Sequence, residues 1–199
     1  MKTGFKKKYQ SVVKPFFDKT AAFFLIVLCL PIFLFFILLL LLFNRGAVFF
    51  HQQRAGKNQQ IFSILKFRTM QDGREISKIG IFLRKLSLDE LPQLVNVLRG
   101  EMSLVGPRPL LVEYLEYYSN EEQRRHVVLP GITGLAQING RNGSDWKTRM
   151  ENDQYYVDNI SFLLDCKILM MTALQLFKFR EADSADQSHG TFIDYASKR

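Results

Sequence analysis

The longest pattern in the sequence is an apolar run from Ala21 to Phe43, which is rich in Leu, Ile and Phe and carries no charged residue. A straight helix of that length rises about 34 Å, enough to cross the ~30 Å hydrocarbon core of a bilayer. The run therefore predicts a membrane helix near the N-terminus. Pro31 lies near its middle, where it removes a backbone hydrogen-bond donor and favours a kink.

The two flanks of this helix leave its topology open. Basic residues outnumber acidic ones on both sides, which favours a cytoplasmic location for both ends. A proline-broken, re-entrant helix that enters and leaves through one face of the membrane would satisfy both flanks, and a kinked single span is the alternative. The basic residues are Lys2, Lys6, Lys7, Lys8, Lys14 and Lys19 before the run, and Arg45, Arg54 and Lys57 after it.

Shorter patterns predict a small, mostly helical unit after the membrane helix. Two runs of β-branched and aromatic residues, 47–54 and 61–69, flank Gly56 and predict a β-hairpin. Helical spacing predicts further helices at 79–86, 88–98 (ended by Gly100), 110–126, 145–159 and 161–179.

The predicted fold class is therefore α+β and mostly helical. We divide the chain into a membrane-associated segment at 1–45 with basic flanks, a second domain at 46–180 and a polar, irregular tail at 181–199. The apolar helix at 161–179 is expected either in the core or, as an amphipathic helix, at the membrane interface.

The amino-acid composition indicates which kinds of molecule the protein binds. The net charge of +8 favours polyanions such as phospholipids, nucleic acids or phosphorylated substrates. Nucleic acid fits poorly, because the chain has a membrane segment and no recognition motif. Cys29 and Cys166 are far apart and form no C-x-x-C pair, so we interpret both as reduced cysteines. Neither the oligomeric state nor a particular sugar follows from these patterns.

One polar stretch, from Arg84 to Gln93, places Asp89 and Glu90 next to each other beside two cations. Ser87 lies three residues before Glu90, which predicts a capping box at a helix start. Such a start carries partial positive charge, so it suits carboxylates, phosphates or both. The ordinary alternative is a capped helix whose acidic first turn complements the helix dipole.

Cationic residues elsewhere favour a chemical role for this acidic pair. They are Lys66 and Arg68 at a strand end, Arg84 and Lys85 before the pair, and Arg108 between two prolines. Phosphoryl transfer needs cations on the phosphate oxygens, carboxylates that bind Mg²⁺ and, in some enzymes, a carboxylate nucleophile. A membrane segment beside such a site suggests that one substrate is a lipid.

A glycine-rich stretch from Pro130 to Gly143 is a weaker candidate for ligand binding. Its backbone amides could approach a ligand closely, but it matches neither the P-loop nor the dinucleotide fingerprint. Gln137 and Arg141 are its candidate contacts with a nucleotide or sugar.

Taken in order, these motifs resemble the monotopic phosphoglycosyl transferases of the bacterial sugar-transferase family. The shared features are the proline-broken apolar helix, Lys66-Phe67-Arg68-Thr69-Met70, Arg84-Lys85-x-Ser87-Leu88-Asp89-Glu90-Leu91-Pro92-Gln93, Gly106-Pro107-Arg108-Pro109 and Pro130-Gly131-Ile132-Thr133-Gly134. The run Arg108-Pro109-Leu110-Leu111-Val112-Glu113-Tyr114 looks most similar to the small members that begin N-linked glycan assembly, which use a UDP-linked diamino-trideoxy sugar. The chain departs from the family at Leu30, where many members have Ser.

The resemblance implies a re-entrant membrane helix and a catalytic domain on the cytoplasmic face of the bacterial inner membrane. It implies that Asp89 attacks a UDP-sugar, that UMP leaves, and that polyprenol (undecaprenyl) phosphate accepts the sugar phosphate. Asp89 and Glu90 would then be the catalytic and Mg²⁺-binding residues. Lys66, Arg84 and Arg108 would bind phosphates, and anionic lipids would attract the basic flanks.

Two other functions remain possible from the residues alone. A Mg²⁺-dependent lipid or nucleotide-sugar pyrophosphatase would need the same cations and carboxylates. A non-enzymatic, basic scaffold at the membrane surface would need only the charge and the apolar helices. The scaffold leaves Asp89 and Glu90 unexplained.

Overall fold

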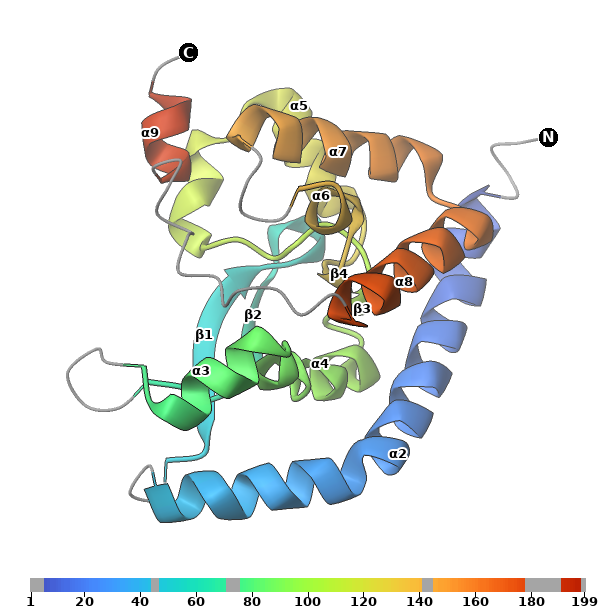
Figure 1. The fold of residues 1–199 in the computed structure, drawn as a ribbon. Helices are drawn as coiled ribbons and strands as arrows, with labels where there is room; N and C mark the ends of the chain where they lie inside the picture. The colour runs from blue at the N-terminus through green and yellow to red at the C-terminus, as the bar shows by residue number, and fades with distance from the viewer. Residues whose placement is uncertain (1–5, 44–46, 71–75, 141–144, 178–190, 198–199) are drawn as a thin grey trace.

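The structure, a computed structural model, describes residues 6–43, 47–70, 76–140, 145–177 and 191–197. These residues form a mostly helical molecule with two small, two-stranded sheets, which confirms the α+β prediction (Figure 1). The boundaries at 45/46 and 180/181 stay a prediction.

The N-terminal apolar run forms one long helix, α2, at Lys14–Phe43, preceded by a π-helical turn at Tyr9–Val13. Pro31 does not interrupt the helix, but Figure 1 shows α2 bent into two arms. The residues against which α2 packs change at the bend. Side chains up to Ile26 pack on the main core, whereas those from Cys29 onward pack on a second cluster, so the change lies in the turn before Pro31, where the proline removes a backbone hydrogen bond. Sharp helix kinks occur mostly at proline, so we attribute the bend to Pro31.

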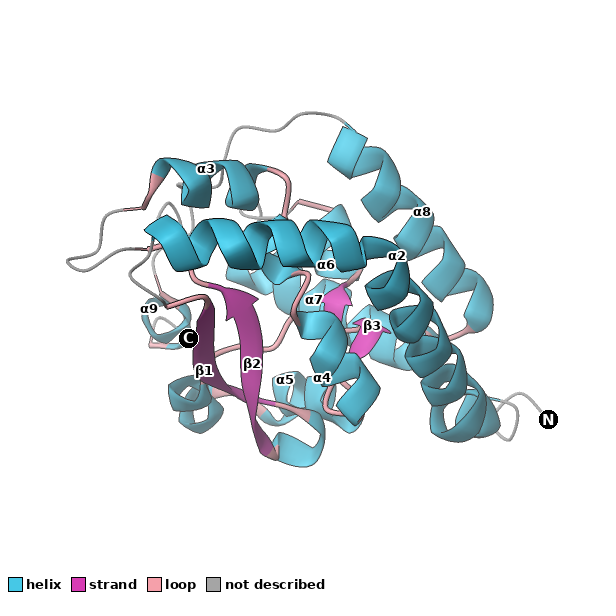
Figure 2. Cartoon of the chain, turned by 90° about the horizontal axis from the view of Figure 1, so that it is seen from below, coloured by secondary structure: helices cyan, strands magenta, loops and turns pink. Residues whose placement is uncertain are grey.

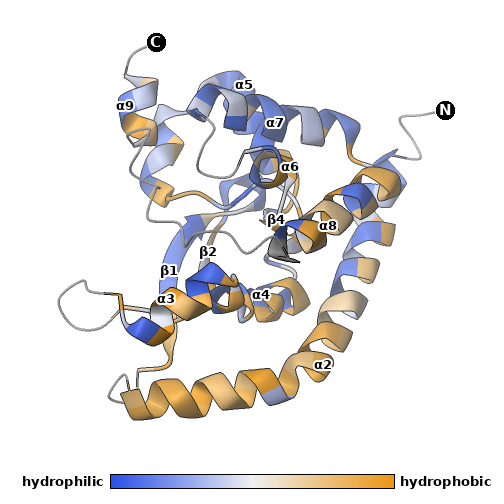
Figure 3. Ribbon diagram, viewed as in Figure 1, coloured by the Kyte–Doolittle hydropathy of each residue, from blue (hydrophilic) through white to orange (hydrophobic). Residues whose placement is uncertain are grey.

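Much of the apolar surface of α2 remains exposed. Leu28 and Leu42, one on each side of Pro31, are 75% and 72% exposed. Figure 3 shows the lower arm, as seen in Figure 1's view, to be hydrophobic over almost all of its visible surface, whereas the upper arm also carries polar residues. The helix meets the length and composition of a membrane-crossing segment. A helix that is apolar all round and unburied is typical of membrane proteins.

The predicted hairpin is confirmed. Strands β1, Phe49–Ala55, and β2, Ile61–Phe67, pair antiparallel from Phe49 opposite Phe67 to Ala55 opposite Ile61. The turn contains a short 3₁₀ segment at Lys57–Gln59. Seen from below in Figure 2, one arm of α2 lies across the hairpin and the helix α3, Lys78–Lys85, where Phe36, Phe67 and Leu83 are buried together.

The acidic stretch differs from the predicted single helix at 88–98. After α3, residues Leu88–Glu90 form a separate 3₁₀ turn, and α4 covers Gln93–Arg99, ended as predicted at Gly100. The predicted capping box was wrong, because Ser87 has a left-handed backbone (φ 56°) and its side chain makes no cap hydrogen bond. Pro92 precedes α4, since a proline cannot donate within the helix interior.

A parallel pair of short strands was missed. Strand β3, Ser103–Val105, pairs with β4, Gly131–Thr133, and the helix α6, Leu135–Ile138, follows directly. The glycine-rich stretch is therefore partly regular structure. At Gly131 an added Cβ would lie 2.1 Å from the amide nitrogen of Gly106, so only glycine permits this approach of the two backbones.

The predicted helix at 110–126 was also wrong. The structure has 3₁₀ segments at Val112–Tyr117 (η4) and Arg124–Val127 (η5), with a short helix, α5, at Asn120–Gln123 between them. Ser119 and Glu122 form a capping box that starts a new helix there.

The two later helices are confirmed, and the tail is not irregular throughout. Helix α7 covers Trp146–Asn159 and α8 covers Phe162–Phe177. Within the tail, Phe192–Ala196 form a helix, α9, whose Phe192 is fully buried. The prediction of an irregular tail was therefore wrong for this segment.

Candidate active site

The predicted phosphate-binding cations and the acidic pair converge on one cleft of about 1390 Å³. Lys66 comes from β2, Asp89 and Glu90 from the 3₁₀ turn, and Arg108 from the loop after β3. Arg84, from the last turn of α3, and Gln137, from α6, line the same cleft. Arg141, the remaining candidate, lies outside the described residues.

Glu90 is the centre of the charge cluster. Its Oε1 accepts hydrogen bonds from Lys66 Nζ at 2.7 Å and from Arg108 Nη2 at 3.1 Å. Its side chain is only 17% exposed, and burial alone would raise its pKa. The charges of Arg108 and Lys66 outweigh burial and lower the pKa of Glu90 to about 2. Glu90 is therefore ionised throughout the physiological pH range.

Asp89 has a different environment from its neighbour. It forms no hydrogen bond or ion pair with any residue that the structure describes. Burial and the charge of Glu90 raise the pKa of Asp89. Three cations act in the opposite direction, namely Lys66, Arg84 and Arg108. The result is a carboxylate that faces a positive field and has no hydrogen-bonding partner among the described residues, so its oxygens remain available to a ligand.

The backbone before Asp89 is strained. Ser87 has φ 56° and ψ 21°, a conformation that costs a non-glycine residue roughly 1–2 kcal/mol. The Ser87 amide donates to the carbonyl of Arg84 at 3.0 Å, and the amide of Glu90 donates to the carbonyl of Ser87 at 3.3 Å. This left-handed residue separates the acidic turn from α3. Such strain clusters at functional sites.

Arg84 is held by the end of the hairpin. Its Nε donates to Thr69 Oγ1 at 2.9 Å, and the Thr69 side chain is buried. Gly80 makes this approach possible, because a Cβ there would lie 2.2 Å from the carbonyl oxygen of Thr69. The guanidinium of Arg84 is therefore fixed by local structure beside the acidic turn.

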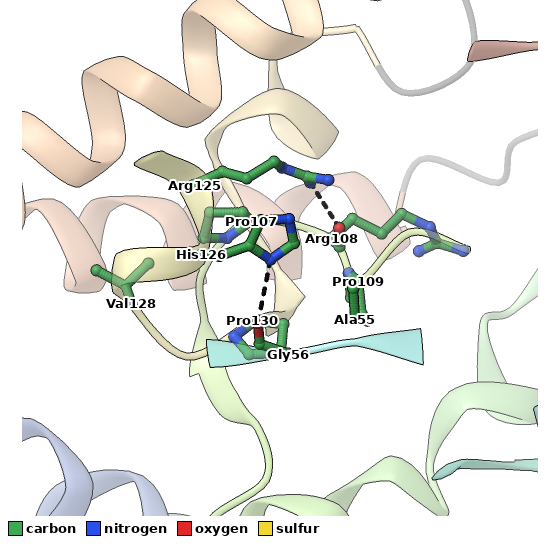
Figure 4. A pocket seen from close by; sticks show the side chains of 9 residues that line it. All are labelled: Ala55, Gly56, Pro107, Arg108, Pro109, Arg125, His126, Val128 and Pro130. Carbon is green, nitrogen blue, oxygen red and sulfur yellow. Dashed lines mark hydrogen bonds between the residues drawn. The ribbon is translucent and has the colours of Figure 1, made fainter. Parts of the chain in front are cut away.

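A buried network that sequence reasoning missed supports Arg108. The Nη2 of Arg125 donates to the backbone carbonyl of Arg108 at 2.7 Å, as Figure 4 shows, and to Asp153 Oδ2 at 2.8 Å. Arg125 Nη1 also donates to the hydroxyl of Tyr118. No local motif signals this role, because Arg125 and Asp153 lie on different elements.

His126 forms a neighbouring contact with the hairpin turn. Its Nδ1 lies 3.0 Å from the carbonyl oxygen of Gly56, and burial together with the charge of Arg125 lowers its pKa to about 4. The ring is therefore neutral at pH 7, and Nδ1 carries the hydrogen that it donates to Gly56 (Figure 4). This contact ties the hairpin turn to the segment that positions Arg108.

Gln137 is partly engaged within the protein. Its amide nitrogen donates to the carbonyl of Ile132 at 2.9 Å, whereas its Oε1 is buried and has no partner among the described residues. The side chain is thereby held against the backbone of β4, and Gln137 lines the cleft.

The acidic pair suits a metal that also binds substrate. Among the described residues, no three His, Cys, Asp or Glu side chains cluster as a metal site. Mg²⁺, however, is often bound by one or two carboxylates together with substrate phosphates. Both contacts of Glu90 use Oε1, so its other oxygen remains directed to neither cation. Asp89 and Glu90 therefore fit a Mg²⁺ ion that is shared with a diphosphate.

Comparison with known proteins agrees with this site. Residues 9–179 match the family described as bacterial sugar transferase. The sugar transferase EpsL of Bacillus subtilis, itself described as uncharacterized, is 50% identical over 81% of this chain and 85% of its own length. The exopolysaccharide production protein ExoY of Sinorhizobium fredii is 37% identical over 85% of this chain and 88% of its own length. The undecaprenyl-phosphate glucose phosphotransferase of Komagataeibacter xylinus is 40% identical over 83% of this chain but 36% of its own.

The chain belongs to the bacterial sugar transferase family. It is an enzyme of the phosphoglycosyl transferase class, which confirms the resemblance seen in its motifs. The narrower similarity to initiators of N-linked glycan assembly is not supported by the names of these relatives and stays a prediction. So do the individual roles of the site residues.

Proposed function

We propose that this enzyme transfers a sugar 1-phosphate from a UDP-sugar to polyprenol (undecaprenyl) phosphate and releases UMP. The observation that carries the proposal is that Asp89, which has no hydrogen-bonding partner among the described residues, lies beside the cluster of Glu90, Lys66 and Arg108. The cleft exceeds the ~300–1,000 Å³ of ordinary small-molecule sites, which supports a site for two substrates. Relatives named for undecaprenyl phosphate support the identity of the acceptor.

The reaction proceeds in two displacements at phosphorus. A carboxylate oxygen of Asp89 attacks the β-phosphorus of the UDP-sugar, the bond to the bridging oxygen breaks, and UMP leaves with the electron pair of that bond. A phosphate oxygen of the lipid then attacks the same phosphorus, which releases Asp89 and forms the lipid diphosphate sugar. Lys66, Arg84 and Arg108 would bind and neutralise the phosphate oxygens during both steps.

Glu90 has a supporting role in this scheme. Its low pKa keeps it ionised, so it holds Lys66 and Arg108 in place rather than supplying a proton. With Asp89 it would hold Mg²⁺, which neutralises charge on the diphosphate when bound.

The proposed location is the cytoplasmic face of the bacterial inner membrane, with α2 re-entrant. Leu25 and Cys29 of α2 line the cleft that contains Asp89, which supports direct access of a membrane lipid to the site. Both arms of α2 pack on the same domain, as a re-entrant helix requires. The basic residues beside it would attract anionic lipids.

The test is Asp89→Asn in the full chain, assayed for UMP release with undecaprenyl phosphate, Mg²⁺ and a panel of UDP-sugars. We expect a loss of about 10³-fold or more with an unchanged melting temperature, because the nucleophile is removed and its shape kept. The matched control is Glu116→Gln, an exposed acid on η4 outside the cleft. Wild-type turnover in the Asp89→Asn variant would show that Asp89 is not the nucleophile.

Two further readouts separate the alternatives. Intact mass of wild type with UDP-sugar alone should show a phosphosugar adduct that is absent from Asp89→Asn. The first displacement releases at most one equivalent of UMP per enzyme without the acceptor, so continued UMP turnover that is independent of undecaprenyl phosphate would identify a pyrophosphatase. Absence of turnover with every sugar, and indifference to Asp89, would favour the membrane scaffold.

A further inference from the structure

The C-terminal helix α9 is anchored by one aromatic side chain. Phe192 is 0% exposed, and its ring centroid lies 5.2 Å from that of Tyr114, 4.8 Å from Tyr118 and 5.3 Å from Trp146. A capping box of Thr191 and Asp194 begins the helix. This aromatic cluster is separate from the two cores that hold α2, the hairpin and α4. Helix α9 is therefore docked by a specific contact and is not merely an unstructured chain end.

The same helix forms part of the active-site cleft. Thr191 and Asp194 line the cleft that contains Asp89, together with Trp146 and Arg149 of α7. The guanidinium of Arg149 lies over the ring of Trp146, 4.7 Å from its centroid. This part of the wall therefore combines a flat aromatic surface and a positive charge with the hydroxyl of Thr191 and the carboxylate of Asp194. The aromatic face suits a nucleobase, and the guanidinium suits a phosphate.

The two ends of the cleft differ in chemistry. Leu25 and Cys29 line it near the bend of α2, whereas Thr191 and Asp194 line it from α9, which lies far from that bend in both Figure 1 and Figure 2. Under the proposed function, a lipid phosphate would reach the cleft from α2. The soluble, anionic donor is then left with the aromatic and cationic wall formed by Trp146, Arg149 and α9.

We propose that α9 is a positioning element for the nucleotide-sugar donor, acting through Trp146 and Arg149. The proposal rests on the proposed function. Phe192 packs edge-on against the Trp146 ring, so it fixes that ring and the cation stacked on it. Loss of the contact would free the wall that faces the donor. Phe192 also packs on Tyr118, which is hydrogen-bonded to Arg125, so the conservative Phe192→Leu keeps an apolar group at that contact.

The first experiment compares three variants of the full chain: Phe192→Ala, the conservative Phe192→Leu, and Ser197→Ala as an exposed control that follows α9. For Phe192→Ala we expect the KM for UDP-sugar to rise about tenfold, with kcat and the KM for undecaprenyl phosphate within about twofold. The Phe192→Leu variant should keep a KM for UDP-sugar close to that of the wild type. Equal changes in both KM values, or none in the donor KM, would overturn the proposal.

The second experiment uses the single tryptophan of the chain, Trp146, as its own reporter. Titration of wild type with UDP should change its fluorescence saturably, and Phe192→Ala should need about tenfold more UDP. An absent response, or equal affinities, would overturn the role of α9. Because this titration requires no turnover, it tests α9 even if the enzyme fails to transfer sugar phosphate, an outcome that would overturn the proposed function instead.

Discussion

Two adjacent carboxylates in this protein have opposite properties because their partners differ. Glu90 is paired with Lys66 and Arg108, and its pKa falls to about 2. Asp89 has the same cations nearby but forms no bond to them, and burial together with Glu90 raises its pKa. A pair of titratable groups driven apart in this way indicates separate roles. We assign attack to Asp89 and the holding of cations to Glu90.

The cations therefore control how readily Asp89 ionises. Lys66 lowers the pKa of Asp89, so Lys66→Met should raise that pKa further. Because attack requires the ionised carboxylate, activity falls as pH drops through this pKa. The acidic limb of the pH profile of kcat/KM should thus move to higher pH. The maximum activity should also fall. Lys85→Met, an exposed lysine outside the cleft, is the control. A uniform loss with an unmoved limb would contradict this account.

Most residues of this site could be predicted from sequence, because Lys66, Arg84, Asp89, Glu90 and Arg108 lie in charged motifs. The conformation of Ser87 could not. A serine three residues before a glutamate suggests a cap, and only tertiary packing imposes the left-handed backbone found there.

Among the helices and strands, sequence patterns correctly predicted the elements that are formed by interactions between residues close in sequence. The hairpin, α3, α7 and α8 follow from hydrophobic spacing and from residues that end helices. The predictions for the segment at 110–126 and for the C-terminal tail were wrong because residues distant in the sequence determine the conformation of both. Arg125 pairs with Asp153 across 28 positions, and Phe192 packs into a cluster around Tyr114.

The buried pair of Arg125 and Asp153 should matter for both stability and activity. Their side chains are 3% and 5% exposed. Arg125→Met leaves Asp153 buried without its cation and should lower stability by ~3–5 kcal/mol. It also removes the donor to the Arg108 carbonyl, so activity should fall beyond any loss of folded protein.

The neighbouring Arg124 provides the control. It pairs with Asp158 at the surface, where both side chains are 49% exposed, so Arg124→Met should cost about 0–1 kcal/mol. Thermal unfolding of both variants, and of Arg125→Met combined with Asp153→Leu, tests the argument. The double variant should regain part of the stability but not the activity. Equal effects of the two single substitutions would show that burial of the pair is unimportant.

The whole molecule is organised around the bent helix α2. A buried polar cluster binds its N-terminal arm to α8, where Asp165 Oδ2 accepts hydrogen bonds from Lys14 Nζ at 2.8 Å and from the Tyr9 hydroxyl at 2.6 Å. Asp18 accepts a hydrogen bond from Ser103 nearby. The sequence left re-entrant and spanning topologies open, since these long-range contacts are invisible in an apolar run. They favour the re-entrant form, because a spanning helix would have to detach this arm.

The contacts of α2 predict a re-entrant topology that depends on the bend at Pro31. In a variant without Cys29 and Cys166, single cysteines at Lys7 and Asn58 should both react with a labelling reagent only from the cytoplasmic side. Pro31→Leu restores a backbone donor and favours a straight helix, so part of the population should expose position 7 to the periplasm. Leu30→Ser, which keeps the proline, is the matched control.

The shift should be partial, because straightening alone leaves the Lys14 and Asp165 pair intact. Breaking a buried pair costs ~3–5 kcal/mol, which opposes detachment of the arm. Adding Asp165→Asn to Pro31→Leu should therefore increase periplasmic labelling at position 7, while Asp165→Asn alone should leave the topology unchanged as long as the bend persists. Periplasmic labelling of position 7 in the parent chain would instead establish a single span, and the bend in α2 would then have no topological role.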